Sequence, residues 1–468
     1  MSSSATGGSS SGTSTSGTTG GAQSQDAGPF TFLAADTSDA GMAGLPIAMA
    51  VGPSDQVGVA YFRPTGNSLG SAVDYGLMYF EVRNGAISVP PAQITVVQNQ
   101  DGLTIDFDAQ GNAVVGFLGG EGSSSYWLQS QAALAYQQSD GGWNLQVCMQ
   151  DSTAMGAFTW TVDQNGSPDM SAMQLVNEGK VVGLWPALVF DGGTALMAYR
   201  DVHFGESPIQ DWAASDVKLC QGTPGNWTSW SAPMTVDASG ADKPGGYGLH
   251  NQLIFGPNGA LAALCDSDST GQGAVDAQGT NVWFAQQNLG SWTNSTSDWS
   301  LPVNPLNPTN NAADVLVDTQ SGPTMAYNAT FGYSVAAVDT SPPGGGPAAL
   351  YYASSPDGQT WSTRQTVFSL GSGGFYPSLA DDPVSGDPNL VYTVCSGDPG
   401  VTPAPGACDA PELHLVVVGT NPPNWAATTT TVTTQAAFTP KIAFLSTDKV
   451  VIAYRDLDTG SIYLAFQR

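Results

Sequence analysis

Basic residues are scarce in this chain. Its 468 residues include 11 Lys and Arg against 39 Asp and Glu, which gives a formal net charge of -28 at pH 7. A protein this acidic repels a phosphate backbone and an anionic membrane surface. The composition therefore excludes nucleic acid as a partner and leaves neutral glycans, cations, basic proteins and small molecules.

Cysteine is also scarce, and no two of the five cysteines have the spacing of a zinc finger, which excludes a structural zinc site. Cys395 and Cys408 flank a loop rich in Gly, Pro and Asp. We predict a disulfide between them that closes a loop of about a dozen residues; the alternative is two thiols. Cys148, Cys220 and Cys265 lie in or beside predicted strands, which indicates core positions with one pair possible among them.

The sequence as given contains no sustained helical periodicity, no signal peptide and no transmembrane run. Residues 1–28 are mostly Ser, Gly and Thr, which predicts a flexible tether before a folded domain at 29–468. This composition resembles the segment that follows the lipidated cysteine of mature bacterial lipoproteins. The resemblance implies an extracellular or outer cell-surface protein whose lipid anchor is missing from this sequence; the alternative is a disordered tail on a cytosolic protein.

The chain does contain a repeat with a period of about 60 residues, typical of solenoids, propellers or arrays. Each copy reads as a short alternating apolar run, a turn, a second apolar run and, in most copies, a third run. The copies begin near Pro46, Leu103, Pro186, Asn251, Ala313, Pro377 and Pro440. Several copies then close on a tryptophan, at Trp143, Trp227, Trp292, Trp361 and Trp425.

This pattern predicts an all-β fold, a seven-bladed β-propeller with four-stranded antiparallel blades. The last copy stops at Arg468 after its third strand, and an orphan apolar run at residues 29–35 precedes the first copy. We place that run on the outside of the last blade, where it closes the ring of sheets. The segment between Leu145 and Trp185 exceeds the period and predicts a decorated loop or an extra hairpin on the second blade.

Polar side chains gather at the predicted ends of strands on one face. The start of the innermost strand and the end of the second strand of a blade lie at the same face of a propeller, so residues at these two positions can share one site. Candidate ligand contacts at this face are Arg63, Glu121, Asp201, Asn251, Tyr376 and Arg455.

The densest cluster of such residues comes from the third and fourth repeats, with Arg200 and His203 in AYRDVHFG and Tyr247 and His250 in GYGLHNQL. A His or Tyr beside an Arg can remove a proton next to a carboxylate while the Arg stabilises the resulting anion, as in a polysaccharide lyase. The His-Asn pair that opens the fourth repeat also resembles propeller lyases. The alternative is that Arg–Asp pairs bridge neighbouring blades and the histidines cap strands.

The segment Ser355-Pro356-Asp357-Gly358-Gln359-Thr360-Trp361 resembles the Asp-box of the sialidase-like superfamily, although it is one residue short. An Asp-box is a structural turn, so the resemblance implies a fold and not an activity. A sialidase also needs three arginines around a carboxylate, and Arg63, Arg200 and Arg455 are the available trio. Because Arg63 follows a second strand instead of opening a first one, sialidase activity is not expected.

Carboxylates on alternate residues precede two glycine turns, at Asp266 and Asp268 and at Asp456 and Asp458. This spacing suits Ca²⁺, although neither segment completes a twelve-residue loop. Asp-rich turns also arise for backbone reasons alone.

Three classes of function are compatible with the sequence. The first is an extracellular ligand-binding or adhesion module directed at glycans. The second is a carbohydrate-active enzyme, a lyase or hydrolase, that uses the Arg/His/Tyr cluster. The third is a protein-interaction scaffold.

Overall fold

The computed structural model describes the strands of the folded domain and most of their turns. The described residues are 28–37, 46–69, 72–97, 100–120, 130–150, 181–202, 215–222, 234–236, 247–268, 279–288, 298–300, 303–307, 321–339, 348–368, 373–396, 409–417, 429–435 and 437–468. The predicted tether, the insertion at 151–180, Glu121, His203 and Cys408 lie outside them.

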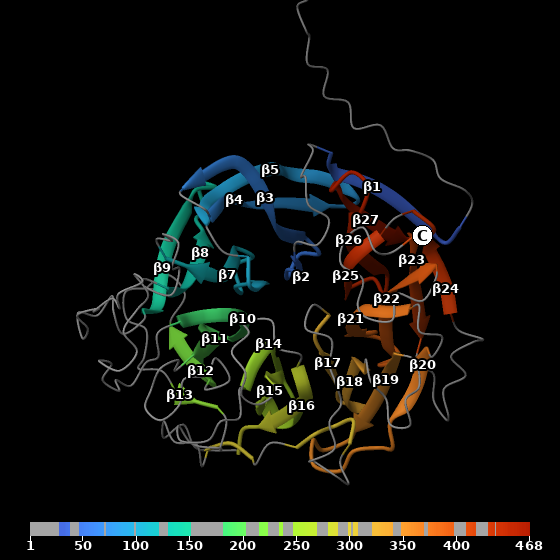
Figure 1. Cartoon of the computed structure of the whole chain (residues 1–468). Helices are drawn as coiled ribbons and strands as arrows, with labels where there is room; N and C mark the ends of the chain where they lie inside the picture. The colour runs from blue at the N-terminus through green and yellow to red at the C-terminus, as the bar shows by residue number, and fades with distance from the viewer. Residues whose placement is uncertain are drawn as a thin grey trace, which may run out of the picture.

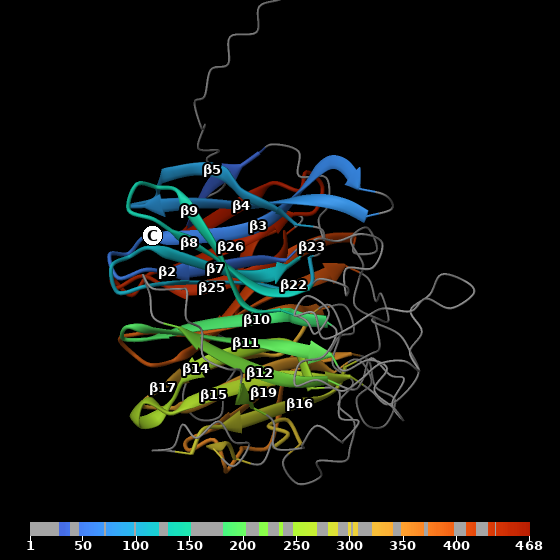
Figure 2. The same cartoon turned by 90° about the vertical axis from the view of Figure 1, so that its left-hand side faces the viewer.

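Seven antiparallel sheets surround one axis (Figure 1), and Figure 2 shows the same sheets from the side. The chain is therefore an all-β, seven-bladed propeller, as the repeat predicts. Within each sheet, strands that follow one another in the sequence are hydrogen-bonded neighbours. No helix in the described part of the chain has the length and hydrophobicity needed to cross a membrane.

The first four blades run in chain order, each from its innermost strand outward. Blade 1 contains β2 (Ile47–Val51), β3 (Val57–Leu69), β4 (Ala72–Arg83) and β5 (Ala86–Val97). Blade 2 contains β6 (Leu103–Phe107), β7 (Ala113–Gly119), β8 (Gln131–Gln137) and β9 (Trp143–Gln150). Blade 3 contains β10 (Val181–Asp191), β11 (Thr194–Val202), β12 (Ser215–Gly222) and β13 (Met234–Thr235). Blade 4 contains β14 (Tyr247–Phe255), β15 (Leu261–Asp268) and β16 (Gly279–Gln286), with a short 3-10 turn at Pro257–Gly259.

The last three blades complete the ring. Blade 5 contains β17 (Thr324–Asn328), β18 (Gly332–Asp339), β19 (Ala349–Ser355) and β20 (Gln365–Phe368). Blade 6 contains β21 (Gly373–Asp381), β22 (Pro388–Ser396), β23 (Asp409–Val417) and β24 (Thr429–Thr433). Blade 7 contains β25 (Ala437–Phe444), β26 (Val450–Asp456) and β27 (Ile462–Gln467), with β1 (Phe30–Asp36) antiparallel to β27 on its outer edge. This is the position that the sequence predicts for the orphan run.

Two blades differ in detail from the repeat pattern. In blade 5 the innermost strand is β17, so the prediction of a repeat that begins near Ala313 was wrong by one strand. Blade 4 has three strands among the described residues. Isolated bridges from Phe284 to Val303 and from Gln287 to Trp299 occupy its outer edge.

The hydrophobic core lies between neighbouring blades. One cluster packs Phe62 and Tyr79 of blade 1 against Phe107 of blade 2, and another packs Leu350 of blade 5 against Leu390 of blade 6. Because each sheet buries both faces against its neighbours, its strands are apolar on both sides, which explains the nearly continuous apolar runs of the sequence.

Each innermost strand has one edge that pairs with no other strand. Side chains from the preceding blade accept hydrogen bonds from some of the backbone N–H groups along this edge. Each of these side chains accepts a hydrogen bond from a backbone N–H of the next blade, which supplies a partner that the missing strand cannot provide. The four bonds run from the N–H of Leu188 to Thr104 Oγ1 at 3.2 Å, of Met325 to Gln252 Oε1 at 2.8 Å, of Leu379 to Thr324 Oγ1 at 3.0 Å, and of Ile442 to Ser378 Oγ at 3.3 Å.

We expect Thr324→Val to lower the free energy of unfolding by about 1 to 3 kcal/mol, because it leaves the buried N–H of Leu379 without its acceptor while keeping the side-chain volume. Urea denaturation measures this change. The matched control is Thr431→Val on the exposed surface of β24, where a change within about 0.5 kcal/mol is expected. Equal effects of the two variants would contradict the capping role.

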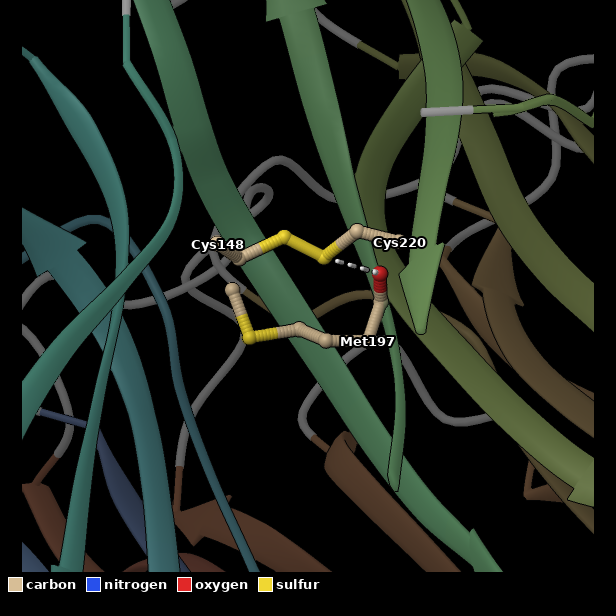
Figure 3. Close-up of a disulfide and its surroundings, with 3 residues drawn as sticks. All are labelled: Cys148, Met197 and Cys220. Atoms are coloured by element: carbon tan, nitrogen blue, oxygen red, sulfur yellow. Dashed lines mark hydrogen bonds between the residues drawn. A yellow bond between two sulfur atoms is a disulfide. The ribbon is translucent and has the colours of Figure 1, made fainter. Parts of the chain in front are cut away.

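A disulfide joins blades 2 and 3. It connects Cys148 of β9 with Cys220 of β12, with 6.4 Å between the two Cα atoms and a sequence separation of 72 residues. Figure 3 shows the bond beside Met197, whose carbonyl oxygen lies 3.6 Å from the sulfur of Cys220. Cys265 is buried and outside any disulfide. Cys395 is disulfide-bonded, but its predicted partner Cys408 lies outside the described residues.

The Asp-box-like segment forms a closed turn between β19 and β20. Asp357 Oδ1 accepts hydrogen bonds from the N–H groups of Gln359 and Thr360, at 2.8 and 2.7 Å. The Trp361 indole is buried, donates to the Gly358 carbonyl at 3.2 Å and packs edge-on against Phe284. The motif therefore anchors blade 5 to blade 4.

Candidate functional site

A set of residues in the left-handed backbone region marks the start of the innermost strands. We call these residues the mouth ring. Two residues after each of them, the innermost strand pairs in regular register with the second strand of its blade. The mouth ring consists of Trp185 (φ 44°), His250 (φ 48°), Gly322 (φ 60°), Tyr376 (φ 54°) and Thr439 (φ 47°) in blades 3 to 7.

Four of these five residues carry a side chain in a region that L-residues rarely occupy. Trp185, Tyr376 and Thr439 also precede a proline, which restricts the backbone further. Each such residue costs about 1 to 3 kcal/mol, and strain of this kind concentrates at functional sites. The repeated strain at one end of the innermost strands therefore marks this end as the candidate site.

His250 and Asp266 form a hydrogen-bonded pair at the mouth ring. His250 Nδ1 lies 3.0 Å from Oδ1 of Asp266, whose side chain is fully buried at the end of β15. A carboxylate accepts but does not donate, so Nδ1 carries the hydrogen, and in the neutral form of the ring Nε2 is the acceptor. Within the described residues Nε2 makes no hydrogen bond, so this face of the ring is available to a ligand.

Trp185 of blade 3 lies beside this histidine. The two ring centroids are 5.5 Å apart, and the indole is partly exposed. The side-chain amide of Asn251 holds Trp185 in place by donating to its backbone carbonyl at 3.0 Å. Asn251 is buried, and its Oδ1 has no hydrogen-bond partner. The site thus joins a partly exposed aromatic surface to one polar group within reach of a ligand, His250 Nε2, with the buried Asn251 beneath it.

Gly322 makes room for the histidine. A Cβ built on Gly322 would lie 2.6 Å from Cγ of His250, closer than real side chains approach. The His250 ring therefore occupies the space that a side chain at position 322 would need. Blade 5 supplies a glycine to the mouth ring because blade 4 fills that position with its histidine.

Arg200 supports the site from within the protein and does not reach a ligand directly. It is 2% exposed, and its Nε–H donates to the hydroxyl of Ser215 at 2.8 Å. That hydroxyl in turn donates to the Tyr247 carbonyl at 2.8 Å, and the guanidinium carbon lies 5.6 Å from the Trp185 ring centroid. These contacts bridge blades 3 and 4, which is the arrangement of the structural alternative, and a catalytic role of Arg200 stays a prediction.

Other predicted site residues around this cluster have mixed positions. Asp201 is fully buried in β11. The Tyr247 ring packs against Trp283, with 5.5 Å between ring centroids. Tyr376 belongs to the mouth ring, but its side chain is 7% exposed and packs against Phe438. Trp185, Tyr247 and His250 are partly exposed, so a ligand can reach them more directly than the buried Asp201, Asn251 and Tyr376.

Arg63 and Arg455 lie at a different place, between blades 7 and 1. Arg63 pairs with Asp36, which also accepts from the Tyr61 hydroxyl. Arg455 is fully buried and donates to the Phe62 carbonyl at 3.0 Å across the blade boundary, and burial lowers its pKa to about 10. Since Arg200 serves the boundary between blades 3 and 4, no described contact brings the three arginines together.

The predicted calcium ligands act in local structure where they are described. Asp456 Oδ1 accepts from the N–H groups of Asp458 and Thr459, at 3.0 and 2.8 Å, and Asp266 holds His250. The carboxylate of Asp268 lies outside the described side chains. Among the described residues, no three His, Cys, Asp or Glu side chains gather as metal ligands.

Comparison with known proteins identifies no family for this chain. No protein-family model matches the chain, and no curated protein matches it. Among solved structures, α-L-arabinanase from Penicillium chrysogenum in complex with arabinobiose is 10% identical, with a TM-score of 0.45 over 93% of this chain and 97% of that chain. The NanB sialidase from Streptococcus pneumoniae is 10% identical, with a TM-score of 0.42 over 94% and 71%. The intramolecular trans-sialidase from Ruminococcus gnavus is 13% identical, with a TM-score of 0.41 over 92% and 98%. Similarity this low transfers no activity to this chain.

Proposed function

We propose that this protein binds a glycan at the mouth ring, over Trp185 and His250. The observation that supports this function is the partly exposed indole beside a histidine whose Nε2 is left open by the buried Asp266. A sugar ring stacks its C–H face on an indole while its hydroxyls donate to nitrogen or oxygen acceptors. The net charge of -28 favours a neutral sugar over a polyanionic one.

A second function, proton-transfer catalysis on a carbohydrate, is favoured by the same pair. A buried carboxylate that holds Nδ1–H orients the imidazole and stabilises the imidazolium that forms when Nε2 takes up a proton. His250 and Asp266 have this arrangement at a separation of 3.0 Å. In this proposal His250 is the general base, Asp266 is its positioning residue, and a lyase or hydrolase reaction follows.

We further propose that the protein acts outside the cell, attached to a bacterial surface through the residues that precede the propeller. The disulfide between Cys148 and Cys220 supports this location, because disulfides persist in oxidising compartments. Ser, Gly and Thr in the first 28 residues suit a spacer.

We expect His250→Ala to weaken glycan binding at least tenfold, the loss that follows from removing one well-placed hydrogen bond and a ring contact. A glycan array identifies the ligand and calorimetry measures its affinity. The matched control is His414→Ala in β23, because His414 also pairs with a carboxylate at 3.0 Å and has a similarly small exposed fraction, but lies away from the mouth ring. Equal affinities of both variants, or no binding by any glycan on the array, would favour the scaffold class.

The catalytic alternative has its own measurement. Incubation with uronate-containing polysaccharides reveals a lyase by the ultraviolet absorbance of unsaturated products. If such activity exists, His250→Ala should lower the rate by a factor of about 100 or more. An unchanged rate would remove His250 from the mechanism, and a glycan that binds without turnover would leave the binding function.

A further inference from the structure

Lys441 occupies a position where other blades carry a hydrogen-bond acceptor. It lies two residues after Thr439 on β25, as Gln252, Thr324 and Ser378 lie two residues after their own mouth-ring residues. Those three side chains accept a hydrogen bond from the next blade. A lysine ammonium has no lone pair and cannot replace them.

The backbone group that Lys441 leaves without this acceptor can be identified from strand register. In blade 7, Lys441 pairs with Ala453, which lies two residues before Arg455. In blade 1, Ile47 pairs with Tyr61, which lies two residues before Arg63, so Ile47 holds the position in blade 1 that Lys441 holds in blade 7. The residue after Ile47 is Ala48. Its N–H therefore corresponds to the N–H groups of Leu379 and Ile442, which donate to side chains of the preceding blade.

Lys441 also lacks a counter-charge. It is partly buried on the innermost strand of blade 7, which borders the propeller axis (Figure 1), and among the described residues it makes no hydrogen bond or ion pair. Burial lowers its pKa, and no neighbouring carboxylate opposes this shift. Arg63, Arg364 and Lys218, in contrast, each face a carboxylate. An ammonium without a carboxylate partner is unusual in a protein this acidic, and it attracts an anion.

A second donor without a partner lies nearby. Thr439, two residues before Lys441, is 7% exposed, and its hydroxyl has no hydrogen-bond partner in the part of the chain that the structure describes. Buried polar groups in native proteins are nearly always satisfied, so an orphaned hydroxyl requires an explanation. The ammonium, the hydroxyl and the N–H of Ala48 are three donors at the boundary of blades 7 and 1.

We propose that Lys441 and Thr439 form the binding site for a carboxylate at the boundary of blades 7 and 1. The bound carboxylate supplies the acceptor that this boundary lacks and neutralises the ammonium. This site lies on blade 7 and does not depend on the glycan proposed at Trp185 and His250 in blades 3 and 4.

Calorimetric titration of the full chain with three probes tests the proposal. D-glucuronate and D-glucose differ in the carboxylate, and acetate provides a carboxylate without a sugar. Glucuronate is expected to bind, and glucose is not expected to compete with it. If acetate binds with the same affinity as glucuronate, the ligand is a small free carboxylate. If acetate binds more weakly than glucuronate, the ligand is a sugar acid. Lys441→Met should lower the affinity for glucuronate at least tenfold.

Matched variants separate this site from general electrostatics and from the mouth ring. Lys449→Met removes an exposed lysine that follows the same strand and should leave glucuronate affinity unchanged. Lys441→Arg should keep binding at alkaline pH, where the wild type loses it as Lys441 deprotonates. Trp185→Ala should leave glucuronate binding intact. Failure of glucuronate and acetate to bind the wild type, or equal affinities of Lys441→Met and Lys449→Met, would overturn the proposal.

Discussion

Replacing both Cys148 and Cys220 by alanine is expected to lower the free energy of unfolding by about 4 kcal/mol. The disulfide spans 72 residues, so it removes much of the chain entropy of the unfolded state. It also joins an outer strand of blade 2 to blade 3, where both cysteines are buried. Denaturation in urea of the oxidised wild type and the double variant measures the difference.

The matched control for this prediction is Cys265→Ala. Cys265 is a buried cysteine outside any disulfide, so its replacement reports the loss of a buried sulfur alone. We expect an effect of about 1 kcal/mol for this variant. If the double variant loses no more than twice the control value, the bond does not stabilise the fold.

Asp381 is expected to make the protein more stable at pH 4 than at pH 8, by up to about 4 kcal/mol. Burial at the end of β21 raises the pKa of this carboxyl to about 7. Both of its oxygens are buried without a hydrogen-bond partner. The unfolded state releases the proton near pH 4 and the folded state only near pH 7, so stability is fully present below pH 4 and falls as the pH rises through 7.

The variant Asp381→Asn should remove this contribution. It should match the wild type at pH 4 and exceed it at pH 8, because the amide does not ionise. Asp357 is a control of opposite sign, since hydrogen bonds from Thr360 and Gln359 lower its pKa. Asp357→Asn should therefore destabilise the protein at pH 7 and have less effect as the pH falls below 4. A pH profile that is the same in Asp381→Asn and the wild type would contradict the assignment.

The repeat pattern was sufficient to predict the blades, but it misplaced one of them. In the fifth repeat the runs at residues 313–317, 324–328 and 332–339 are all apolar and separated by turns, so any two of them can serve as the first hairpin. Strand alternation is a local property and does not tell an innermost strand from its neighbour. Contact of β17 with β14 and β21 makes that choice.

The candidate site was predicted in part. Because the start of an innermost strand and the end of a second strand share a face, His250 and Asp266 belong at the same end of the sheet. The Asp-x-Asp spacing suggested calcium for Asp266. In the structure, the pairing of Leu249 with Asp266 brings this carboxylate to the histidine instead. The sequence did not predict Trp185 as a site residue, because composition does not reveal which bulky residue adopts a positive φ. The recurring X-Pro pairs at 185–186, 322–323, 376–377 and 439–440 were the available signal.

By itself, the sequence determined the number of blades, the closing strand and the face on which strand ends meet, since alternation and turn residues act over a few positions of the chain. Only the tertiary structure decided which polar groups are neighbours: the histidine beside the indole, the sulfur atoms of blades 2 and 3, and the lysine without an acceptor. The first two contacts join residues more than 50 positions apart, and the third depends on an acceptor that a neighbouring blade lacks. Packing between blades decides all three.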